Sequence, residues 1–165
     1  MQATAALQIE AVDPQHPQAL ALLREAAREA RKLYPELFAA DAPAPTNPPL
    51  RAREVYLIAW RDGRALGCGA LRQRDEFTGE LQRMFVTGTA RRDGVARALL
   101  ARLEHDARQH GYRQLVLETG ERQGPAIALY SGCGWRRIAA YGPYLGDPMS
   151  VCFGKALPVR ALARG

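Results

Sequence analysis

The sequence has few cysteines and no long apolar run, and each shortage excludes a class of protein. Its three cysteines, Cys68, Cys133 and Cys152, are odd in number and widely spaced, which excludes a disulfide framework and a zinc-finger pattern. We expect them to be small buried side chains, and we expect no metal site. The longest apolar run, residues 55–60, is far too short to span a bilayer. The N-terminus lacks a basic stretch followed by an apolar one, so we expect a cytoplasmic protein without a membrane anchor.

Lysine is also scarce, because Lys32 and Lys155 are the only two in the chain and arginine supplies the remaining positive charge. The formal net charge is +6, and residues 83–102 hold five arginines but one acidic residue. Charge gathered in one short stretch favours a compact phosphorylated ligand, with nucleic acid as an alternative. A nucleic-acid surface would need aromatic side chains near its arginines for base stacking, and Phe85 alone meets that need. The three scattered histidines are expected at the surface.

The length and the ordinary composition predict one domain over residues 1–165, with a core over about 7–157. Apolar periodicity predicts about seven strands, at residues 7–12, 54–61, 66–73, 80–86, 114–118, 135–140 and 149–155. It predicts about four helices, at residues 17–34, 94–111 and 125–132 and as a short turn after Pro35. This order is typical of an α/β fold whose mixed sheet is antiparallel at first and parallel around the helix at 94–111.

Local signals refine this outline. Asp62-Gly63 is a two-residue hairpin turn signal, and Gly67 and Gly69 in the next strand indicate a bulge or a close backbone approach. The Pro-rich residues 35–53 are expected to form a loop after the short helical turn. The helix at 17–34 is expected to bury one apolar face, made of Leu20, Leu23, Ala27, Ala30 and Tyr34.

Residues 78–111 form the unit around which the rest is organised: a strand, a short basic turn and a long helix. The helix has an apolar stripe at helical spacing and a left-handed stop at Gly111; the stripe is Val95, Leu99, Leu100, Leu103 and Ala107. The first turn of a helix has N–H groups without partners and partial positive charge. Gly94 and Ala96 would let an anion approach those groups, and the arginines of the turn add charge. Local pattern alone leaves two readings open, a phosphate site and an ordinary solvated turn.

Arg91-x-x-Gly94-x-Ala96 resembles the Gln/Arg-x-x-Gly-x-Gly/Ala signature of the GNAT superfamily, the acyl-CoA-dependent N-acyltransferases. Upstream, residues 80–86 are similar to the cofactor-binding strand of that family, and downstream residues 115–135 are similar to its next strand, helix and "LY…GF" ending. The resemblance covers about residues 7–157 and is to a small bacterial member. It implies a GNAT-like sheet in which two parallel strands, 80–86 and 114–118, splay apart to admit the pantetheine arm of acetyl-CoA.

The resemblance also implies which residues bind the co-substrate acetyl-CoA. The pyrophosphate would lie on the basic turn and the helix N-terminus, formed by Arg91, Arg92, Asp93, Gly94, Val95, Ala96 and Arg97. The backbone of Met84, Phe85 and Val86 would pair with pantetheine, and Gln123 stands where the family often has an Asn contacting that arm. Asp93 departs from the family pattern, because an acidic side chain repels phosphate. Asp is also a favoured helix N-cap, so Asp93 is an alternative cap for the helix at Gly94.

Two side chains are predicted to be catalytic by the same resemblance. Tyr130 would protonate the departing thiolate, although by itself a tyrosine in an apolar helix is more often a core residue. Glu80 would be the general base that deprotonates the amine, and Glu118 on the neighbouring strand competes for that role. The amine would attack the thioester directly, without a covalent acyl-enzyme.

The sequence therefore predicts an N-acetyltransferase that moves the acetyl group of acetyl-CoA onto an amine of a small molecule or peptide in a ternary complex. The amine is expected between the loop at 34–53, the turn at 74–78 and the loop at 140–149, with aromatic walls from Tyr34, Phe38, Tyr141 and Tyr144. A non-catalytic acyl-CoA sensor of the same fold is the first alternative, disfavoured because Tyr130 and Glu80 are both present. A basic nucleic-acid binder is the second. A homodimer is compatible with the resemblance.

Overall fold

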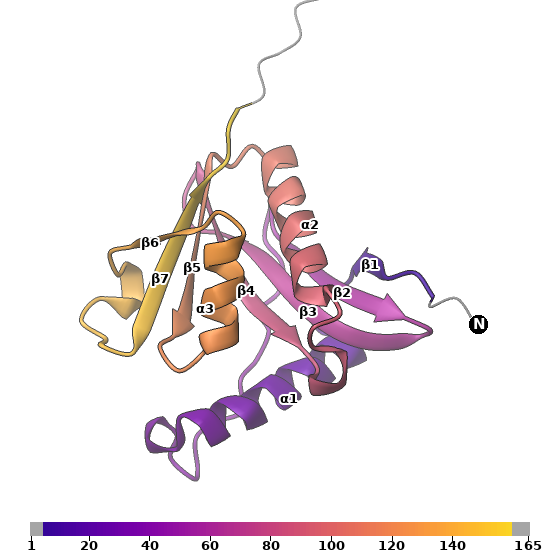
Figure 1. Cartoon of the computed structure of the whole chain (residues 1–165), viewed down its shortest axis with the longest axis vertical. Helices are drawn as coiled ribbons and strands as arrows, with labels where there is room; N and C mark the ends of the chain where they lie inside the picture. The colour runs from indigo at the N-terminus through magenta and orange to yellow at the C-terminus, as the bar shows by residue number, and fades with distance from the viewer. Residues whose placement is uncertain (1–4, 160–165) are drawn as a thin grey trace, which may run out of the picture.

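The computed structural model describes residues 5–159, and one seven-stranded sheet runs through them in the order β1-β2-β3-β4-β5-β7-β6 (Figure 1). Its strands are β1 (Gln8–Ala11), β2 (Val55–Arg61), β3 (Arg64–Gln73), β4 (Thr78–Val86), β5 (Gln114–Gly120), β6 (Arg136–Ile138) and β7 (Ser150–Ala156). The described α-helices are α1 (Pro17–Leu33), α2 (Val95–Gln109) and α3 (Gly124–Gly132). Three short 3-10 helices join them: η1 (Pro35–Leu37), η2 (Gly88–Ala90) and η3 (Gly142–Tyr144).

The sheet is mixed, as predicted. Strands β1 to β4 pair antiparallel, β4 and β5 pair parallel, and β7 pairs antiparallel with both β5 and β6. Helix α2 connects β4 to β5, which is the crossover that a parallel pair requires. The seven strands and their order agree with the prediction, whereas the described residues contain three α-helices instead of about four.

Helix α1 covers one face of the sheet, and helices α2 and α3 cover the other (Figure 1). The larger core lies between the sheet and α2 and α3, and the apolar stripe of α2 predicted from the sequence is buried in it. Removing a leucine such as Leu99 or Leu103 from water is worth about 2 kcal/mol. The helix ends as predicted, with Gly111 at φ +82° and the N–H of Tyr112 donating to the carbonyl of Ala107 at 3.0 Å.

The smaller core lies under the N-terminal half of α1, where Ala19 and Leu22 pack against β2 and β3. The predicted contact face was partly wrong, because Leu20, Ala27 and Ala30 are only half-buried while Ala19, Leu22 and Leu23 are fully buried. The helix crosses the sheet near its N-terminal end, so its later turns contact little of the sheet surface (Figure 1). His16, expected at the surface, is half-buried and caps α1 by accepting the N–H of Gln18 through Nδ1 at 3.0 Å.

Two glycine positions in the β3 region behave as predicted. Asp62 and Gly63 have φ of +51° and +72°, which is the type I′ geometry of a two-residue hairpin. A Cβ at Gly69 would lie 2.7 Å from the sulfur of Met84 and 2.8 Å from a methyl group of Leu103, so a larger residue there would require these side chains to shift. Gly69 faces two residues of β4, Arg83 and Met84, because its neighbours Cys68 and Ala70 pair with Phe85 and Gln82. Strand β4 therefore carries a β-bulge, with Arg83 at φ +60°.

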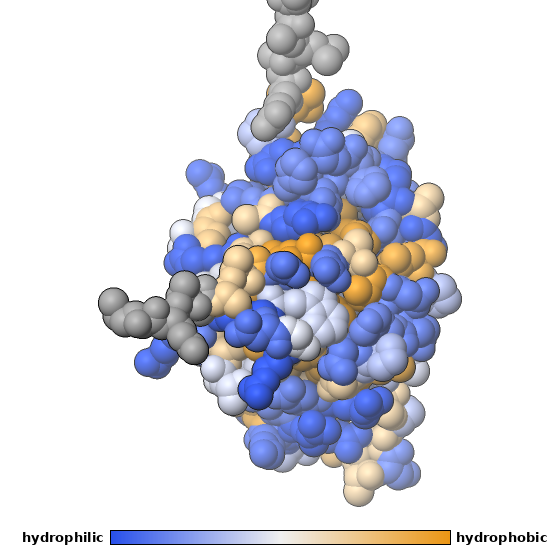
Figure 2. Space-filling view, turned by 90° about the vertical axis from the view of Figure 1, so that its right-hand side faces the viewer, coloured by the Kyte–Doolittle hydropathy of each residue, from blue (hydrophilic) through white to orange (hydrophobic). Residues whose placement is uncertain are grey.

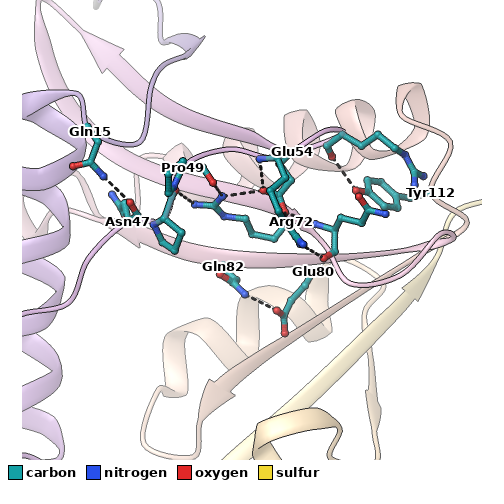
Figure 3. A network of polar contacts seen from close by, with 12 residues as sticks. Gln15, Asn47, Pro49, Glu54, Arg72, Glu80, Gln82 and Tyr112 are labelled. Atoms are coloured by element: carbon teal, nitrogen blue, oxygen red, sulfur yellow. Dashed lines mark hydrogen bonds and ion pairs between the residues drawn. The ribbon is translucent and has the colours of Figure 1, made fainter.

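A network of polar contacts holds the Pro-rich loop against the sheet (Figure 3). Arg72 on β3 donates to the carbonyls of Pro48 and Pro49 at 2.7 and 3.0 Å. The buried Asn47 donates to the carbonyl of Pro14 at 3.0 Å, and its own carbonyl accepts from Gln15 at 2.6 Å. The last part of the Pro-rich loop, which has no regular secondary structure, is thereby fixed at Asn47, Pro48 and Pro49.

Glu54 is the anionic centre of this network, with a side chain 1% exposed. Burial opposes its charge, but the N–H groups of Arg51 and Gln73 and the guanidinium groups of Arg72 and Arg51 outweigh burial and lower the pKa of Glu54 to about 2. Each of its oxygens accepts more than one hydrogen bond, including 3.0 Å from Arg72 and 2.8 Å from the backbone of Arg51. Residue 54 is thus ionised throughout the neutral range.

The face seen in Figure 2 is largely hydrophilic, with an apolar area open on it. Cys68 and Cys152 are buried as predicted, while Cys133 is only half-buried because it lies at the exposed end of α3. Within residues 5–159 no helix is long and apolar enough to cross a membrane. The same residues contain no group of three or more His, Cys, Asp or Glu side chains suited to a metal ion.

The Glu54 network makes a prediction for stability. Because the folded pKa of Glu54 is below its ordinary value, its contribution is present above the unfolded pKa and is lost as the pH falls through about 2. We expect Glu54→Gln to lower the free energy of unfolding by about 3 kcal/mol at pH 7. Urea titrations at pH 7 and pH 3 should show a smaller difference from wild type at pH 3.

The matched control is Glu76→Gln, which changes an exposed carboxylate in the adjacent β3–β4 turn and should have little effect at either pH. An equal loss of stability at pH 7 and pH 3 for Glu54→Gln would contradict the electrostatic account.

Candidate functional site

The sheet opens between its two parallel strands. Pairing between β4 and β5 runs from Thr78 and Gln114 to Leu81 and Leu117 and then stops. Beyond that point β4 continues to Val86 with β3 as its partner, while β5 continues to Gly120 with β7 as its partner. Figure 1 shows the two strands diverging beside α3. Between residue 82 and Val86 the β5-facing edge of β4 is thus free of a strand partner, and the predicted splay is confirmed.

The divergence has local causes on both strands. On β4, the bulge at Arg83 bends the strand just past the last β5 pair. On β5, Gly120 contacts the buried Tyr34 so closely that a Cβ there would lie 2.0 Å from the tyrosine hydroxyl. That hydroxyl accepts the N–H of Arg122 at 2.8 Å, which holds the end of β5 against the end of α1. Tyr34 was expected to form an aromatic wall of the amine site. This was wrong, because its side chain is buried, packs against Gly120 and accepts the N–H of Arg122.

The basic turn lies where β4 ends and α2 begins. Gly94 occupies the N-cap with φ +77°, and no described side chain caps the helix, so the N–H groups of its first turn have neither an intrahelical nor a side-chain acceptor. No acidic residue lies in that first turn. Asp93, predicted as an alternative N-cap, does not cap α2; its carboxylate lies 3.7 Å from the guanidinium of Arg61 on β2. This partly exposed ion pair partly offsets the repulsion that the Asp93 carboxylate would exert on an anion at the turn.

The three arginines of the turn are not equivalent. Arg91 donates to Glu29 of α1 at 2.5 Å and to the carbonyl of Val86 at 3.2 Å. Arg97 reaches the sulfur of Cys133 at 3.5 Å and lies across the end of α3. Arg92 is exposed at φ +70° and forms no ion pair within the described residues. Arg92 and Arg97 are therefore the cations available to an anion at this helix N-terminus, while the charge of Arg91 is largely matched by Glu29.

Tyr130 lies near the end of α3 in the larger core, 5% exposed, with its ring 5.9 Å from Trp135 and 5.7 Å from Phe153. Burial raises the pKa of Tyr130 to about 12. Gln123 is the N-cap residue of α3 and is half-buried, and its side chain does not cap the helix. Both residues thus lie on the helix that packs beside the opening, and their predicted roles remain predictions.

Glu80 lies on β4, one residue before the last pair with β5, and it is half-buried. Its two oxygens accept hydrogen bonds from Gln82 at 2.5 Å and from the hydroxyl of Tyr141 at 2.6 Å (Figure 3 shows the first). Tyr141 comes from the β6–β7 loop. Two donors fix the carboxylate while leaving it lone pairs for a further donor.

Glu118 lies on β5, directly after the last pair with β4, and accepts from Ser150 at 2.8 Å. Burial raises the pKa of Glu118, and the charges of Asp147 and Glu80 add to that effect against the hydrogen bond from Ser150. The charge of Glu80 therefore acts on Glu118, the second candidate base, at the opening of the sheet.

The β6–β7 loop closes over these carboxylates. The rings of Tyr141 and Tyr144 meet edge-on with centroids 5.4 Å apart, and the guanidinium of Arg74 lies 4.4 Å above the ring of Tyr141. Burial and the hydrogen bond to Glu80 raise the pKa of Tyr141. Burial and the charges of Glu80 and Glu118 raise the pKa of Tyr144 to about 12. Both hydroxyls therefore stay protonated at neutral pH, and that of Tyr141 donates to Glu80.

The site thus joins an uncapped helix N-terminus, a free strand edge and two carboxylates, and comparisons identify the family. The model of the acetyltransferase (GNAT) family matches residues 20–135.

The chain belongs to the GNAT family of acetyltransferases.

Relatives and solved structures agree with this membership. An IAA acetyltransferase of Azospirillum brasilense is 44% identical over 103 residues, which are 62% of this chain and 67% of that protein. A crystal structure of a candidate acyl-CoA N-acyltransferase from Klebsiella pneumoniae is 33% identical, with a TM-score of 0.75 over 92% of this chain and 97% of that one. A GNAT acetyltransferase from Elizabethkingia anophelis, solved with acetyl-CoA bound, is 17% identical and shares the fold, with a TM-score of 0.66 over 92% of this chain and 98% of that one. This protein is therefore an acyltransferase by family.

Several residues of this GNAT site carried no signal in the sequence. Gln82, Ser150 and Arg74 each contact a candidate catalytic group or its loop, but single polar residues in strands and turns have no distinctive pattern. Arg83 was counted in the basic stretch, yet its guanidinium points away from the α2 N-terminus and donates to Asn47 at 3.1 Å. Gly69 was the one sequence signal that bore indirectly on Arg83, since this glycine accommodates the β4 bulge in which Arg83 lies.

Proposed function

We propose that this GNAT protein transfers the acetyl group of acetyl-CoA directly to an amine of a small molecule or peptide in a ternary complex. The observation that carries the proposal is the opening between β4 and β5 beside an uncapped N-terminus of α2. An extended polar chain ending in phosphates fits this arrangement, because the unpaired strand edge and the helix N-terminus that follows it in the chain both offer backbone donors. The related structure with acetyl-CoA bound supports the choice of donor.

The donor's pyrophosphate is proposed to lie on the first turn of α2, where the N–H groups of Val95, Ala96 and Arg97 are available. Arg92 and the side chain of Arg97 add positive charge, and no Cβ obstructs the approach at Gly94. Arg91 contributes indirectly, by bonding the carbonyl of Val86 and fixing the end of β4.

The donor's pantetheine arm is proposed to run along the free edge of β4 at Met84, Phe85 and Val86. In this position the arm takes the place of the missing β5 pairs. Gln123 at the start of α3 lies on the other side of the opening, where its amide is able to bond the arm.

Proton transfers are assigned to the two sides of the opening. Glu80, held by Gln82 and Tyr141, takes the proton that the ammonium must lose before the neutral amine attacks, with Glu118 as the second candidate. Tyr130 gives a proton to the departing thiolate, because a phenol whose pKa is raised to about 12 stays protonated at neutral pH. Positioning of the two reactants supplies the rest of the rate enhancement, with no covalent intermediate. The cytoplasmic location and a homodimer stay predictions.

The unequal arginines of the turn lead to a binding prediction. Arg92→Gln should weaken acetyl-CoA binding about tenfold, because it removes a charged donor to phosphate. The matched variant Arg91→Gln should lose no more than about threefold, since its guanidinium is already paired with Glu29. Isothermal titration calorimetry at constant salt measures both. Equal losses for the two variants would contradict this assignment of the phosphate site.

Transfer itself is tested by release of free thiol from acetyl-CoA against a panel of primary amines. Wild type should release thiol with at least one amine, and Tyr130→Phe should lower kcat about 100-fold with acetyl-CoA affinity unchanged. The ring of the variant keeps its contacts with Trp135 and Phe153, so the loss reports on the hydroxyl. Acetyl-CoA binding without turnover by wild type would indicate a sensor of this fold instead. Full activity in Tyr130→Phe would exclude Tyr130 as the acid.

A further inference from the structure

Arg83 is a fixed cation that the donor site does not use. Its Nε donates to the side-chain oxygen of Asn47 at 3.1 Å, and its Nη2 donates to the carbonyl of Thr46 at 2.9 Å. Both acceptors are neutral, so they orient the guanidinium without cancelling its charge. Within residues 5–159 Arg83 has no carboxylate within 4.0 Å, unlike Arg72, Arg91 and the other paired arginines.

The backbone holds Arg83 in place at a conformational cost. The residue lies in the β4 bulge at φ +60°, a left-handed conformation that is strained for a residue with a side chain. Its anchor Asn47 is 3% exposed and is fixed in turn by bonds to Pro14 and Gln15. A strained residue with a buried anchor is preorganised, and preorganised donors bind an anion with little further loss of entropy.

The position of Arg83 is on the amine side of the opening. Its partners Thr46 and Asn47 belong to the Pro-rich loop, which lies on the α1 face, whereas α2 and its phosphate-binding N-terminus serve the other face. Glu80 and Glu118 alternate with Leu81 and Leu117, which face the α2 core, so both carboxylates also lie on the α1 face. Tyr141 donates to Glu80 and Ser150 donates to Glu118, so two carboxylates and one guanidinium lie on the same face of the sheet beside the β6–β7 loop.

This arrangement is complementary to a molecule with both charges. An ammonium group is attracted to the carboxylates of Glu80 and Glu118, and a carboxylate is attracted to the free N–H groups of the guanidinium, two of whose five donors are used. We propose that Arg83 binds a carboxylate of the acceptor, so that the preferred acceptors are amines that also carry a carboxylate, as amino acids do. This inference rests on the proposed function, because it assigns the acceptor of the same site.

Matched acceptor pairs test the proposal. Each amino acid of the standard set is compared with its carboxamide, which keeps the amine and the side chain but removes the negative charge. Wild type should show kcat/KM at least tenfold higher for the best amino acid than for its carboxamide. Arg83→Gln should raise KM for that amino acid about tenfold or more with kcat within threefold, and should leave the carboxamide nearly unchanged. Arg83→Lys should recover part of the preference, because it keeps the charge but not the fork.

The control variant is Arg113→Gln, which should keep the preference for amino acids over carboxamides. In the wild type, the guanidinium of Arg113 lies 4.1 Å from the centre of the Phe77 ring, away from the opening. Acetyl-CoA affinity and melting temperature of each variant report folding independently of the acceptor. Equal use of acids and carboxamides by wild type, or an equal loss for both in Arg83→Gln, would overturn the inference while leaving acetyl transfer intact. A wild-type protein that transfers acetyl to no amine at all would remove the proposed function and this inference together.

Discussion

The interruption of pairing between β4 and β5 after Leu81 and Leu117 is the constraint on which the site depends. A parallel pair that continued to Val86 would satisfy its own backbone and leave no edge for a ligand. Two contacts prevent this: the bulge that Gly69 admits at Arg83, and the packing of Tyr34 on Gly120 that holds the end of β5 elsewhere. The unpaired edge has a free-energy cost in the isolated protein, and pairing with a bound donor would remove that cost.

The same strand links the two halves of the chemistry. Strand β4 carries the proposed base Glu80 near its start and Arg83 in its middle, and it ends at the turn before α2. One element would thus position the proposed base, the proposed acceptor contact and the proposed phosphate site. The Glu54–Arg72 network stabilises the neighbouring β3 and the Pro-rich loop, whose Asn47 reaches Arg83. Stability and the proposed acceptor specificity would therefore be coupled through one polar network.

Much of the fold was predictable because local physics dictates it. The stripe of α2, the stop at Gly111 and the turn at Asp62-Gly63 depend on residues close in sequence, and all three agree with the structure. The candidate site was predictable in outline from the resemblance of Arg91, Gly94 and Ala96 to the family signature. Its pairings were not, because they join distant residues: Tyr141 to Glu80, Glu29 to Arg91, and Arg61 to Asp93. Tyr34 was misassigned for the same reason, since its burial depends on Gly120 at the far end of another strand.

The most direct measurement is amide hydrogen exchange of residues 82–86 with and without acetyl-CoA. The account predicts that the free edge of β4 exchanges readily alone and slows at least tenfold when the donor is bound, together with the first turn of α2. Edge strands β1 and β6 should not change, because they lie away from the opening. Saturating acetyl-CoA that leaves exchange at residues 82–86 unaltered would contradict the claim that the donor occupies the β4–β5 opening.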